Sequence, residues 1–450
     1  MNNKELSLKS ISPIDGRYKD KTSILSNYFS EYAFMKYRVL VEIEYFLELS
    51  KTNILNLQTL SDKNKKDILL ISQNFNLEDA VKIKNIENEI NHDVKAVEYF
   101  IKMKFDELEL SKYKEFIHFG LTSQDINNTA TPLMIKDSLE KVILKCYKKL
   151  HKSLNQISSS FKNISMISRT HGQPATPTTF GKEIKVFEKR LNVQLKSLSE
   201  IPHNGKFGGA SGNLNAHYAA FPKINWDNFS NRFLKRIGLV RSEPTTQIEH
   251  YDNMASKFHN ISRINTILID LCKDIWHYIS INYLVQKINL KEVGSSTMPH
   301  KVNPIDFENA EGNLMIANSQ LIFLANKLPV SRLQRDLTDS TVSRNIGIPF
   351  SHIKIALDSL ITGLQKIDIN NKVIKFDLQS NWAVVSEAIQ TILRRENIES
   401  SYEILKDFTR GNKKINEKSI KKFINDLPVN KSVKKELLKI SPENYLGNLK

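Results

Sequence analysis

Two long stretches of the sequence contain neither proline nor glycine, and this constrains the fold more than any other feature. They are Leu133–His171 and Thr245–Val293, and the second is 49 residues long. Because proline and glycine are the residues that most disfavour a helix, such stretches predict long helices. From Ile261 to Ile288, apolar residues recur every three or four positions on more than one stripe. A helix of this kind needs neighbours on several sides, so we predict a central helical bundle that supplies some of them and other subunits that supply the rest.

The rest of the chain also favours helices, and the alternation typical of strands is rare. Apolar residues at helical spacing predict further helices over Glu31–Ser50, Lys182–Ile201 and Ile305–Leu328. The glycine-rich stretch Gly205–Asn215 lacks the G-x-G-x-x-G spacing of a dinucleotide site, and we expect a loop or short hairpin there. We predict an all-α protein with three domains: an N-terminal helical domain over 1–111, a central long-helix bundle over 112–365 and a small C-terminal helical domain over 366–450.

The formal net charge of +16 raises the question of a nucleic-acid partner. The lysines are scattered and recur beside glutamates on predicted helix faces, and they do not form one basic arm. The sequence contains no recognisable nucleic-acid-binding module. We therefore interpret the charge as general composition, with steering of an anionic small substrate as a secondary benefit, and expect no nucleic-acid partner.

Motifs for metals and cofactors are absent from the sequence. The 11 histidines are dispersed, Cys146 and Cys272 form no metal-type pair, and there is no P-loop or G-x-S-x-G motif. We therefore expect no metal and no cofactor. The polar N-terminus lacks the apolar segment of a signal peptide, and no apolar run reaches about 18 residues, so no membrane span is expected. Two buried thiols fit a reducing compartment, and we expect a cytoplasmic protein.

Six polar clusters interrupt the helical pattern, and each could carry chemistry. The first is a turn that ends in Arg17 and Tyr18. These side chains could hold a phosphate, although an ordinary surface turn has the same composition. In the second cluster, Asn91, His92 and Asp93 lie inside a helical pattern. The carboxylate could set the tautomer of the imidazole or raise its pKa, and a structural histidine is the alternative.

The third and fourth clusters adjoin predicted helices. Thr122 and Ser123 precede Asp125, and hydroxyls and N–H groups at a helix start could bind a carboxylate. An ordinary helix N-cap is the alternative. Arg169–Pro177 follows the first long helix, which would place His171 at a helix C-terminus. There the helix dipole would favour a protonated imidazole, a suitable acid for a nitrogen leaving group, and a structural C-cap is the alternative.

The fifth cluster is Gly294–Pro304, which gathers hydroxyls, an amine, an imidazole and an amide in one loop. Ser295 is the candidate base, activated if nearby N–H groups, an ammonium and the exclusion of water lower its pKa. Lys301 and Asn303 would stabilise the doubly charged carboxylate that forms when the adjacent carbon loses its proton. Asn309 follows on the next predicted helix.

The sixth cluster lies between Arg332 and Arg344. Within it, Arg335 and Arg344 flank a hydroxyl pair, Ser340 and Thr341. Two guanidinium groups and two hydroxyls are a reasonable phosphate grip. A helix start with surface ion pairs fits the same composition.

The order of these clusters resembles that of the fumarase/aspartase superfamily, and Gly294–Pro304 resembles its signature loop. Within the superfamily the chain is most similar to the adenylosuccinate lyase family of bacterial purine synthesis, over about Ser12–Gly447. Arg169–Pro177 resembles the acid motif of that family. Its substrate-binding motifs are matched by Asp15–Tyr18, Asn91–Asp93, Thr122–Ser123, Gln247, Arg335 and Ser340–Arg344. The resemblance implies an all-helical, three-domain homotetramer whose active sites combine residues from three subunits.

The resemblance also implies a reaction. Fumarate would be eliminated from adenylosuccinate, giving AMP, and from succinyl-aminoimidazole carboxamide ribotide (SAICAR), giving its carboxamide (AICAR). His171 would be the general acid and Ser295 the general base. The phosphoribosyl end would be held by Arg17, Tyr18, Arg335, Ser340 and Arg344. The succinyl carboxylates would be held by Thr122, Ser123, Ser296, Lys301 and Asn303. The remaining substrate-binding positions are His92 and Gln247 at the junction, together with Asn91, Asp93, Asn309 and Thr341.

Three other functions compete with this interpretation. The nearest is another fumarate-releasing lyase, of the argininosuccinate lyase or fumarase/aspartase type. Arg17–Tyr18 and Ser340–Arg344 argue against it, because they suit a phosphate that the substrate of fumarase lacks. An inactive lyase scaffold would be expected to have lost a catalytic residue, whereas His171, Ser295 and Lys301 are all present. An RNA-binding helical protein would rest only on the net charge. A small anionic nucleotide is the expected substrate.

Overall fold

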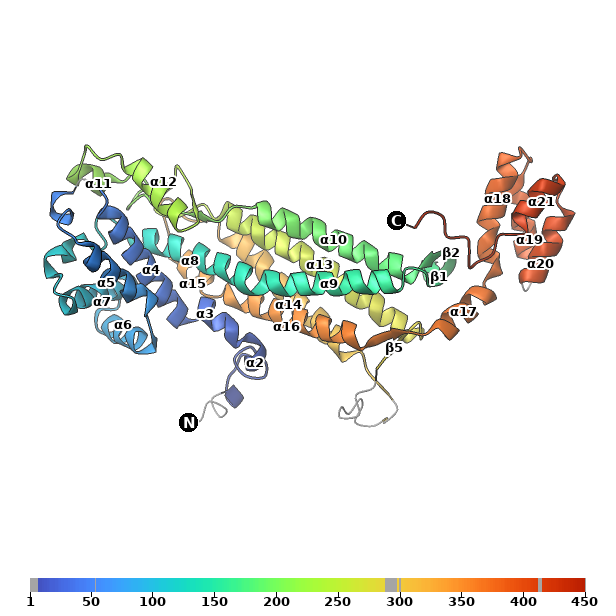
Figure 1. Ribbon diagram of the computed structural model, residues 1–450, viewed down its shortest axis with the longest axis horizontal. Coiled ribbons are helices and arrows are strands. Elements are labelled where there is room, and N and C mark those ends of the chain that lie inside the picture. The colour runs from blue at the N-terminus through green and yellow to red at the C-terminus, as the bar shows by residue number, and fades with distance from the viewer. Residues whose placement is uncertain (1–6, 53, 288–297, 299–300, 412–414, 450) are drawn as a thin grey trace. The chain divides into compact units, whose positions relative to one another are not determined.

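The computed structural model describes residues 7–449 except 53, 288–297, 299–300 and 412–414 (Figure 1). The chain divides into two compact units, which are described separately. Unit 1 comprises Met1–Lys148, Gln194–Thr266 and Gly312–Asp358. Unit 2 comprises Lys149–Val193, Ile267–Glu311 and Ser359–Lys450.

Helices dominate the described part of the chain. The helices are α2 (Lys19–Thr22), η1 (Ser23–Leu25), α3 (Ser26–Phe29), α4 (Glu31–Leu49), η2 (Leu55–Leu57), α5 (Asp62–Gln73), α6 (Leu77–Ile90), α7 (Asp93–Glu107), η3 (Ser111–Phe116), α8 (Ser123–Ser138), η4 (Leu139–Ile143, a π-helical turn), α9 (Leu144–Ser160), α10 (Phe180–Glu200), α11 (Asn215–Ala220), α12 (Trp226–Arg236), α13 (Asp252–Ser280), α14 (Ile305–Lys327), α15 (Thr338–Ser343), α16 (Gly347–Lys366), α17 (Asn371–Ser380), η5 (Trp382–Val385), α18 (Ser386–Arg395), α19 (Ser401–Gly411), α20 (Glu417–Asp426) and α21 (Lys431–Leu437). The strands are β1 (Ser165–Thr170), β2 (Gln173–Thr179), β3 (Asn204–Gly205), β4 (Val240–Arg241), β5 (Leu284–Gln286) and β6 (Ile367–Ile369).

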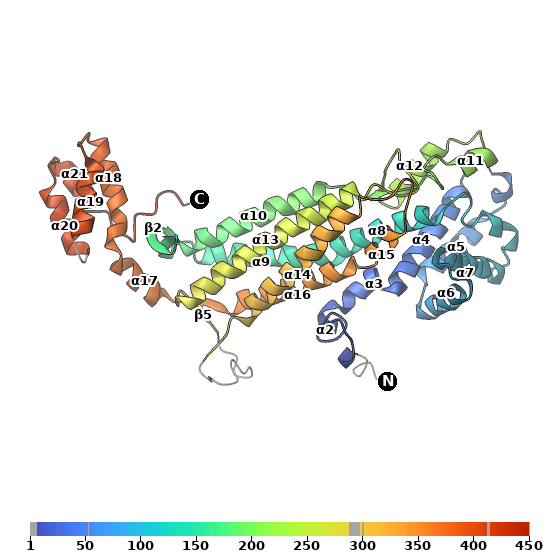
Figure 2. The same ribbon diagram turned by 180° about the vertical axis from the view of Figure 1, so that it is seen from behind.

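The long helices contribute residues to both units. Within each unit they lie side by side in both views (Figures 1 and 2). The predicted helices over 31–50, 182–201 and 305–328 are confirmed as α4, α10 and α14, with ends that differ by one or two residues. Their apolar stripes pack against neighbouring helices, and this burial stabilises them more than intrinsic helix propensity does.

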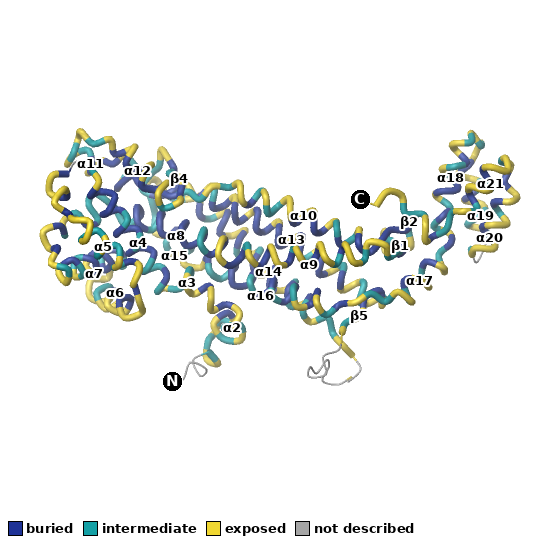
Figure 3. The backbone as a smooth tube through the Cα atoms, viewed as in Figure 1, coloured by how far each residue is buried: buried dark blue, intermediate teal, exposed yellow. Residues whose placement is uncertain are grey.

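The core of unit 1 forms around α4. Ser30 caps this helix, because its Oγ accepts a hydrogen bond from the backbone N–H of Ala33 at 3.1 Å. The helix packs against α5, α7 and α8, and most of its residues are buried (Figure 3). Tyr45 and Phe46 belong to this core, where the ring of Phe46 lies edge-on to Phe105. The same core fixes the start of α8, which carries candidate site residues.

In unit 2, the C-terminal helices α18 to α21 form a separate hydrophobic cluster. Trp382, Ile389 and Leu393 are buried members of this cluster. The rings of Phe408 and Phe423 stack with their centroids 4.2 Å apart. These short amphipathic helices bury one face each against the others, as the spacing of their apolar residues requires.

The prediction that Leu133–His171 is helical throughout is wrong at its end. The helix stops at Ser160, and β1 and β2 form an antiparallel hairpin in which Thr170 faces Gln173. His171 and Gly172 make the turn with φ values of 53° and 74°. A two-residue turn with both φ values positive matches the twist of the strands, whereas it is incompatible with a right-handed helix. His171 therefore lies at a hairpin tip, and the argument from the helix dipole does not hold.

The prediction of a helix up to the 294–304 loop is also wrong in part. The second long helix, α13, ends at Ser280, and Asn282 has a φ of 58°. Asparagine enters this left-handed region more easily than other residues with a side chain, so a helix can end without proline or glycine. The following residues, Leu284–Gln286, pair with β6. Among the described residues, no helix is long and apolar enough to cross a membrane.

Candidate active site

A cavity of about 430 Å³ in unit 1 gathers most of the predicted binding residues of that unit. Its walls come from α4, the junction of α6 and α7, the start of α8 and the segment 335–344. The predicted residues in its lining are Asn91, His92, Asp93, Ser123, Arg335, Ser340 and Arg344. The fold thus brings three separate polar clusters into one pocket.

Arg335, Ser340 and Arg344 form one wall, on and beside α15. Arg335 Nη2 donates a hydrogen bond to Ser340 Oγ at 3.1 Å, and Arg335 Nη1 donates to Gln247 Oε1 at 3.5 Å. The side chain of Asp339 faces the same cavity. Two guanidinium groups beside a hydroxyl can bind a phosphate through charge-assisted hydrogen bonds.

Asp93 joins two arginines in the lining of the same cavity. Its Oδ2 lies 2.6 Å from Arg38 Nη2 and 3.1 Å from Arg344 Nη2. Burial is the largest single influence and disfavours the ionised carboxylate, but the charge and hydrogen bond of Arg38, the backbone N–H of Val94 and the charge of Arg344 together outweigh it, and the pKa of Asp93 is lowered. Arg344 Nη1 also lies 3.4 Å from Glu31 Oε2. Asp93 is therefore ionised at neutral pH and orients both guanidinium groups.

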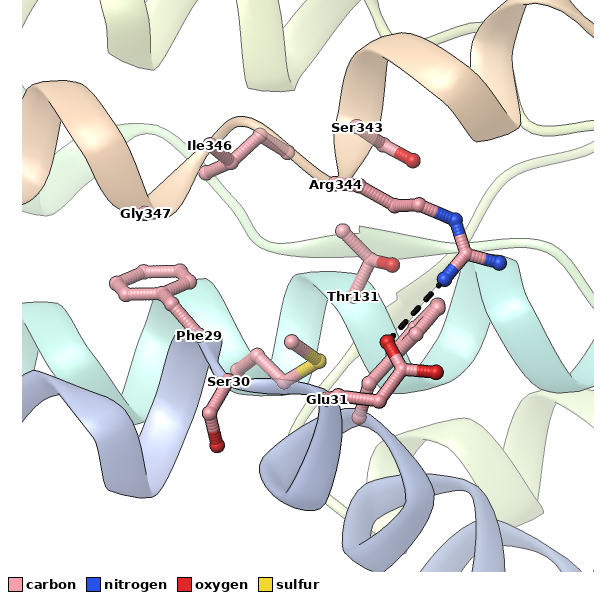
Figure 4. A pocket seen from close by; sticks show the side chains of 10 residues that line it. Phe29, Ser30, Glu31, Thr131, Ser343, Arg344, Ile346 and Gly347 are labelled. Atoms are coloured by element: carbon pink, nitrogen blue, oxygen red, sulfur yellow. Dashed lines mark hydrogen bonds and ion pairs between the residues drawn. The ribbon is translucent and has the colours of Figure 1, made fainter. Parts of the chain in front are cut away.

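A smaller cavity of about 110 Å³ adjoins the first and shares Phe34, Thr131, Ser343 and Arg344 with it. Figure 4 shows the Arg344 guanidinium pointing toward the Glu31 carboxylate at its edge. The ring of Phe34 lies 3.8 Å from the Arg38 guanidinium, a cation–π contact that helps to hold this buried arginine.

His92 adopts the N-cap position of α7. Its Nδ1 accepts a hydrogen bond from the backbone N–H of Lys95 at 3.1 Å, so in the neutral ring Nε2 carries the proton. Asn91 has a φ of 53° and ends α6. The prediction that these residues lie inside one helix is therefore wrong, because the left-handed Asn91 separates α6 from α7.

The start of α8 presents Thr122 and Ser123. Thr122 occupies the N-cap position, and its backbone N–H donates to Asp125 Oδ2 at 2.8 Å. The N-cap interpretation of Thr122 is thus confirmed. Ser123 lines the cavity at the positive end of the helix, so the two interpretations of this cluster are compatible.

Other predicted residues of unit 1 lie outside the cavity lining. Arg17 lies beside Tyr18, with its guanidinium carbon 5.9 Å from the ring centroid, immediately before α2. Gln247 lies behind Arg335 and also donates to the carbonyl oxygen of Ala210 at 3.0 Å. Thr341 lies on α15 beside the lining residue Ser340. Gln247 therefore supports the wall of the cavity.

The predicted residues of unit 2 lie on separate elements. His171 is exposed at the tip of the β1–β2 hairpin, and the nearby Arg169 makes an ion pair with Asp377 at 2.7 Å. Lys301 and Asn303 precede α14, and the backbone N–H of Lys301 donates to Met298 O at 3.0 Å. Asn309, on α14, accepts a hydrogen bond from Ser359 Oγ at 2.9 Å. Ser295 and Ser296 lie outside the described residues.

Several lining residues were not predicted from the sequence. Arg38 is buried on α4 and donates to Asn127 Oδ1 at 2.9 Å as well as to Asp93. Tyr251 accepts from Asn128 Nδ2 at 2.6 Å and donates to Asp339 at 3.1 Å. A signal for Arg38 was available, because it falls on the apolar stripe of its helix, where an unpaired charge would be costly. In the described ranges, no group of three or more His, Cys, Asp and Glu side chains could hold a metal ion.

Comparison with known proteins supports a family assignment. A model of the lyase family matches residues 16–318, and a model of the adenylosuccinate lyase C-terminal region matches residues 331–446. The chain is 56% identical to adenylosuccinate lyase of Dictyostelium discoideum, over 98% of this chain and 97% of the relative. It is 45% identical to adenylosuccinate lyase of Escherichia coli (strain K12), over the same shares of the two chains.

Solved structures show the same fold. Fumarate lyase from Mesorhizobium sp. BNC1 matches with a TM-score of 0.73 at 18% identity, over 94% of this chain and 95% of the other. The 3-carboxy-cis,cis-muconate lactonizing enzyme from Pseudomonas putida matches with a TM-score of 0.70 at 18% identity, over 94% of both chains. The predicted helical fold of the fumarase/aspartase type is confirmed. From the two family models and the full-length identity to its relatives, the chain belongs to the adenylosuccinate lyase family of the fumarase/aspartase superfamily.

Proposed function

We propose that this chain eliminates fumarate from adenylosuccinate, giving AMP, and from SAICAR, giving AICAR. As a member of its family it is a carbon–nitrogen lyase of purine biosynthesis. The observation that carries the choice of substrate is the unit 1 cavity, where Arg335, Ser340 and Arg344 lie together. Such a wall suits the phosphate of a nucleotide.

In the proposed reaction, Ser295 is the general base and His171 the general acid. Ser295 takes the proton from the carbon next to a carboxylate, and the electrons of that C–H bond form the double bond of fumarate. The carbon–nitrogen bond breaks, and His171 gives a proton to the nitrogen that leaves. The negative charge that develops on the carboxylate is stabilised by Lys301 and Asn303.

The remaining residues bind the two ends of the substrate. Arg335, Ser340 and Arg344 bind the phosphoribosyl end. Arg17 and Tyr18 also bind this end. Thr122, Ser123 and Ser296 hold the succinyl carboxylates, while His92 and Gln247 lie at the junction. Support for this arrangement comes from Ser123 and His92, which line the same cavity as the two arginines. Four further residues stay predicted binding residues: Asn91, Asp93, Asn309 and Thr341.

We further propose a homotetramer whose active sites combine residues from several subunits. The cavity is lined by residues of unit 1, whereas His171 belongs to unit 2. In the proposed tetramer, a partner subunit supplies the acid. Support for association comes from large apolar side chains exposed on α14, namely Met315, Ile316, Ile322 and Phe323. A cytoplasmic location and the three-domain division at about residues 111 and 365 stay predictions.

An activity assay tests the proposed substrate. The purified chain is mixed with adenylosuccinate, and the loss of its near-ultraviolet absorbance is followed, with argininosuccinate and malate as parallel substrates. We expect turnover of adenylosuccinate and none of the other two. Turnover of argininosuccinate or malate, without any change in adenylosuccinate, would contradict the proposal and favour another lyase of the superfamily.

A further inference from the structure

The glycine-rich loop from Lys206 to Leu214 takes no part in the proposed chemistry, yet it packs directly against α8. It follows β3, which pairs with β4, and leads into α11. The backbone N–H of Lys206 donates to Asn128 O at 3.3 Å, and Thr129 Oγ1 donates to Lys206 O at 3.3 Å. The loop is therefore held along the first turns of the helix that carries Ser123.

The carboxylate of Asp125 joins this loop to the N-terminus of α8. Its Oδ1 accepts hydrogen bonds from Lys206 Nζ at 2.8 Å, from the backbone N–H of Gly208 at 2.8 Å and from that of Gly209 at 3.1 Å. Its Oδ2 accepts from the backbone N–H of Thr122 at 2.8 Å. One side chain thus ties the loop to the N-cap residue.

The pair of Lys206 and Asp125 is completely buried, with neither side chain reaching solvent. Lys206 Nζ also donates to Gly209 O at 2.5 Å. Removing two charges from water costs free energy, and apolar residues of similar size often stabilise a core as well or better. Stability alone therefore does not explain why the chain has this buried ion pair. Its hydrogen bonds hold the loop and the start of α8 in one geometry, and this positioning explains the pair better.

The loop also supports the wall of the cavity that Arg335, Ser340 and Arg344 form. Its Ala210 O accepts from Gln247 Nε2 at 3.0 Å, and Gln247 in turn accepts from Arg335 at 3.5 Å. Ser340 Oγ, which Arg335 contacts, also lies 3.5 Å from Gln124 Nε2 on α8. The loop thus contacts both the start of α8 and Gln247, which supports Arg335.

The turn before α8 fits closely against α11. Gly120 has a φ of +67°, and a Cβ atom there would lie 2.7 Å from a ring carbon of His217. Only glycine allows both the backbone conformation and this approach. The backbone that leads into Thr122 is therefore held on two sides, by His217 and by the Asp125 carboxylate.

We propose that Lys206 is a positioning residue of the active site, which acts through Asp125 to place Thr122 and Ser123 against a carboxylate of the substrate. The inference rests on the proposed function, because that function gives Thr122 and Ser123 their task. Lys206 itself touches no substrate. Its loss moves the N-terminus of α8, so it weakens substrate binding more than it slows the chemical step.

The test is the steady-state kinetics of Lys206→Met, which keeps the length of the side chain and removes the ammonium. We expect the KM for adenylosuccinate to rise about tenfold or more, while kcat changes by less than about threefold. Lys257→Met is the matched control. Lys257 is also buried, and its ammonium binds the carbonyl of Ile201 and no cavity residue. This control leaves no buried carboxylate unpaired and is expected to leave KM unchanged.

A double variant, D125N/K206M, separates positioning from stability. It removes both buried charges, so it is expected to regain the Tm lost in Lys206→Met, because no unpaired charge is left in the core. Its KM is expected to stay high, because the carboxylate that ties Thr122 to the loop is gone. If Lys206→Met alone does not fold, the KM of the double variant decides.

Two results would overturn the inference. One is a folded Lys206→Met protein whose KM lies within about twofold of the wild type. The other is a double variant that regains the wild-type KM together with its Tm, which would show a purely structural role. A wild-type chain without activity on adenylosuccinate would contradict both the proposed function and this inference. An active wild type, together with an unchanged KM in Lys206→Met, would contradict this inference alone.

Discussion

At the residue scale, buried polar side chains of unit 1 depend on specific partners. His217 is fully buried, and its Nε2 lies 2.9 Å from the hydroxyl of Tyr45, which itself donates to Phe119 O. Nε2 therefore carries the proton, and within the described residues Nδ1 has no hydrogen-bond partner. Burial lowers the pKa of His217 to about 4, because a charged ring would be desolvated there.

This lowered pKa predicts a pH dependence of stability. The unfolded chain binds a proton on this histidine below about pH 6.5, while the folded chain does so only near pH 4. Stability is therefore fully present above the unfolded pKa and falls with decreasing pH, by up to about 1.4 kcal/mol per pH unit. Urea unfolding of the wild type and His217→Gln between those two pH values measures the slope. An equal slope in both proteins would contradict the assignment.

The sequence grouped candidate site residues where they are neighbours along the chain. Arg335, Ser340 and Arg344 fall in one short segment, and they do line one cavity. Arg38 and Tyr251 were missed because their role depends on contacts with residues far away in the sequence. Arg38, for example, meets Asp93 only when α4 packs against the start of α7. The composition of the sequence does not reveal contacts between residues that are far apart along the chain.

At the element scale, apolar periodicity located the helices, but the absence of proline and glycine did not locate their ends. The chain leaves the helical conformation at Asn91 and Asn282, and it turns at His171, each with a positive φ. Such residues bear side chains that tolerate the left-handed region, and the tertiary structure decides whether they enter it. The hairpin of β1 and β2 was missed for this reason.

The hairpin predicts how a glycine change alters turnover. Gly172 has a φ of +74° and open space around it, so Gly172→Ala strains the backbone by about 1 kcal/mol without a clash. A shifted turn misplaces His171, and we expect kcat to fall roughly tenfold. Gly447→Ala is the control, because Gly447 has a φ of +62° and equally open space. Unchanged kcat in Gly172→Ala would argue against His171 as the acid.

At the scale of the whole molecule, the two units each hold part of the predicted chemistry. The cavity with its arginines belongs to unit 1, while His171, Lys301 and Asn303 belong to unit 2. Sequence resemblance implied the combination of these parts from several subunits. Composition did not establish such sharing. Exposed apolar side chains on α14, such as Phe323, are the described feature that the proposed association would cover.

A mixing experiment tests the sharing of sites between subunits. His171→Ala and Ser295→Ala are each expected to lose turnover by orders of magnitude while still binding substrate. When the two are unfolded, mixed in equal amounts and refolded together, about one site in four combines both intact residues under random assembly. Recovery of activity to that order is expected. Absence of any recovery, with tetramers formed, would contradict the shared site.

The unit 1 cavity is proposed to hold the phosphate end of adenylosuccinate, and the kinetics of Arg335→Gln test this most directly. Loss of a charge-assisted hydrogen bond of about 1.5–3 kcal/mol predicts that kcat/KM falls between about 10-fold and 150-fold. Arg395→Gln is the control, because Arg395 pairs with Glu436 on the surface of unit 2. An Arg335→Gln protein that is folded and keeps the wild-type kcat/KM would contradict the account.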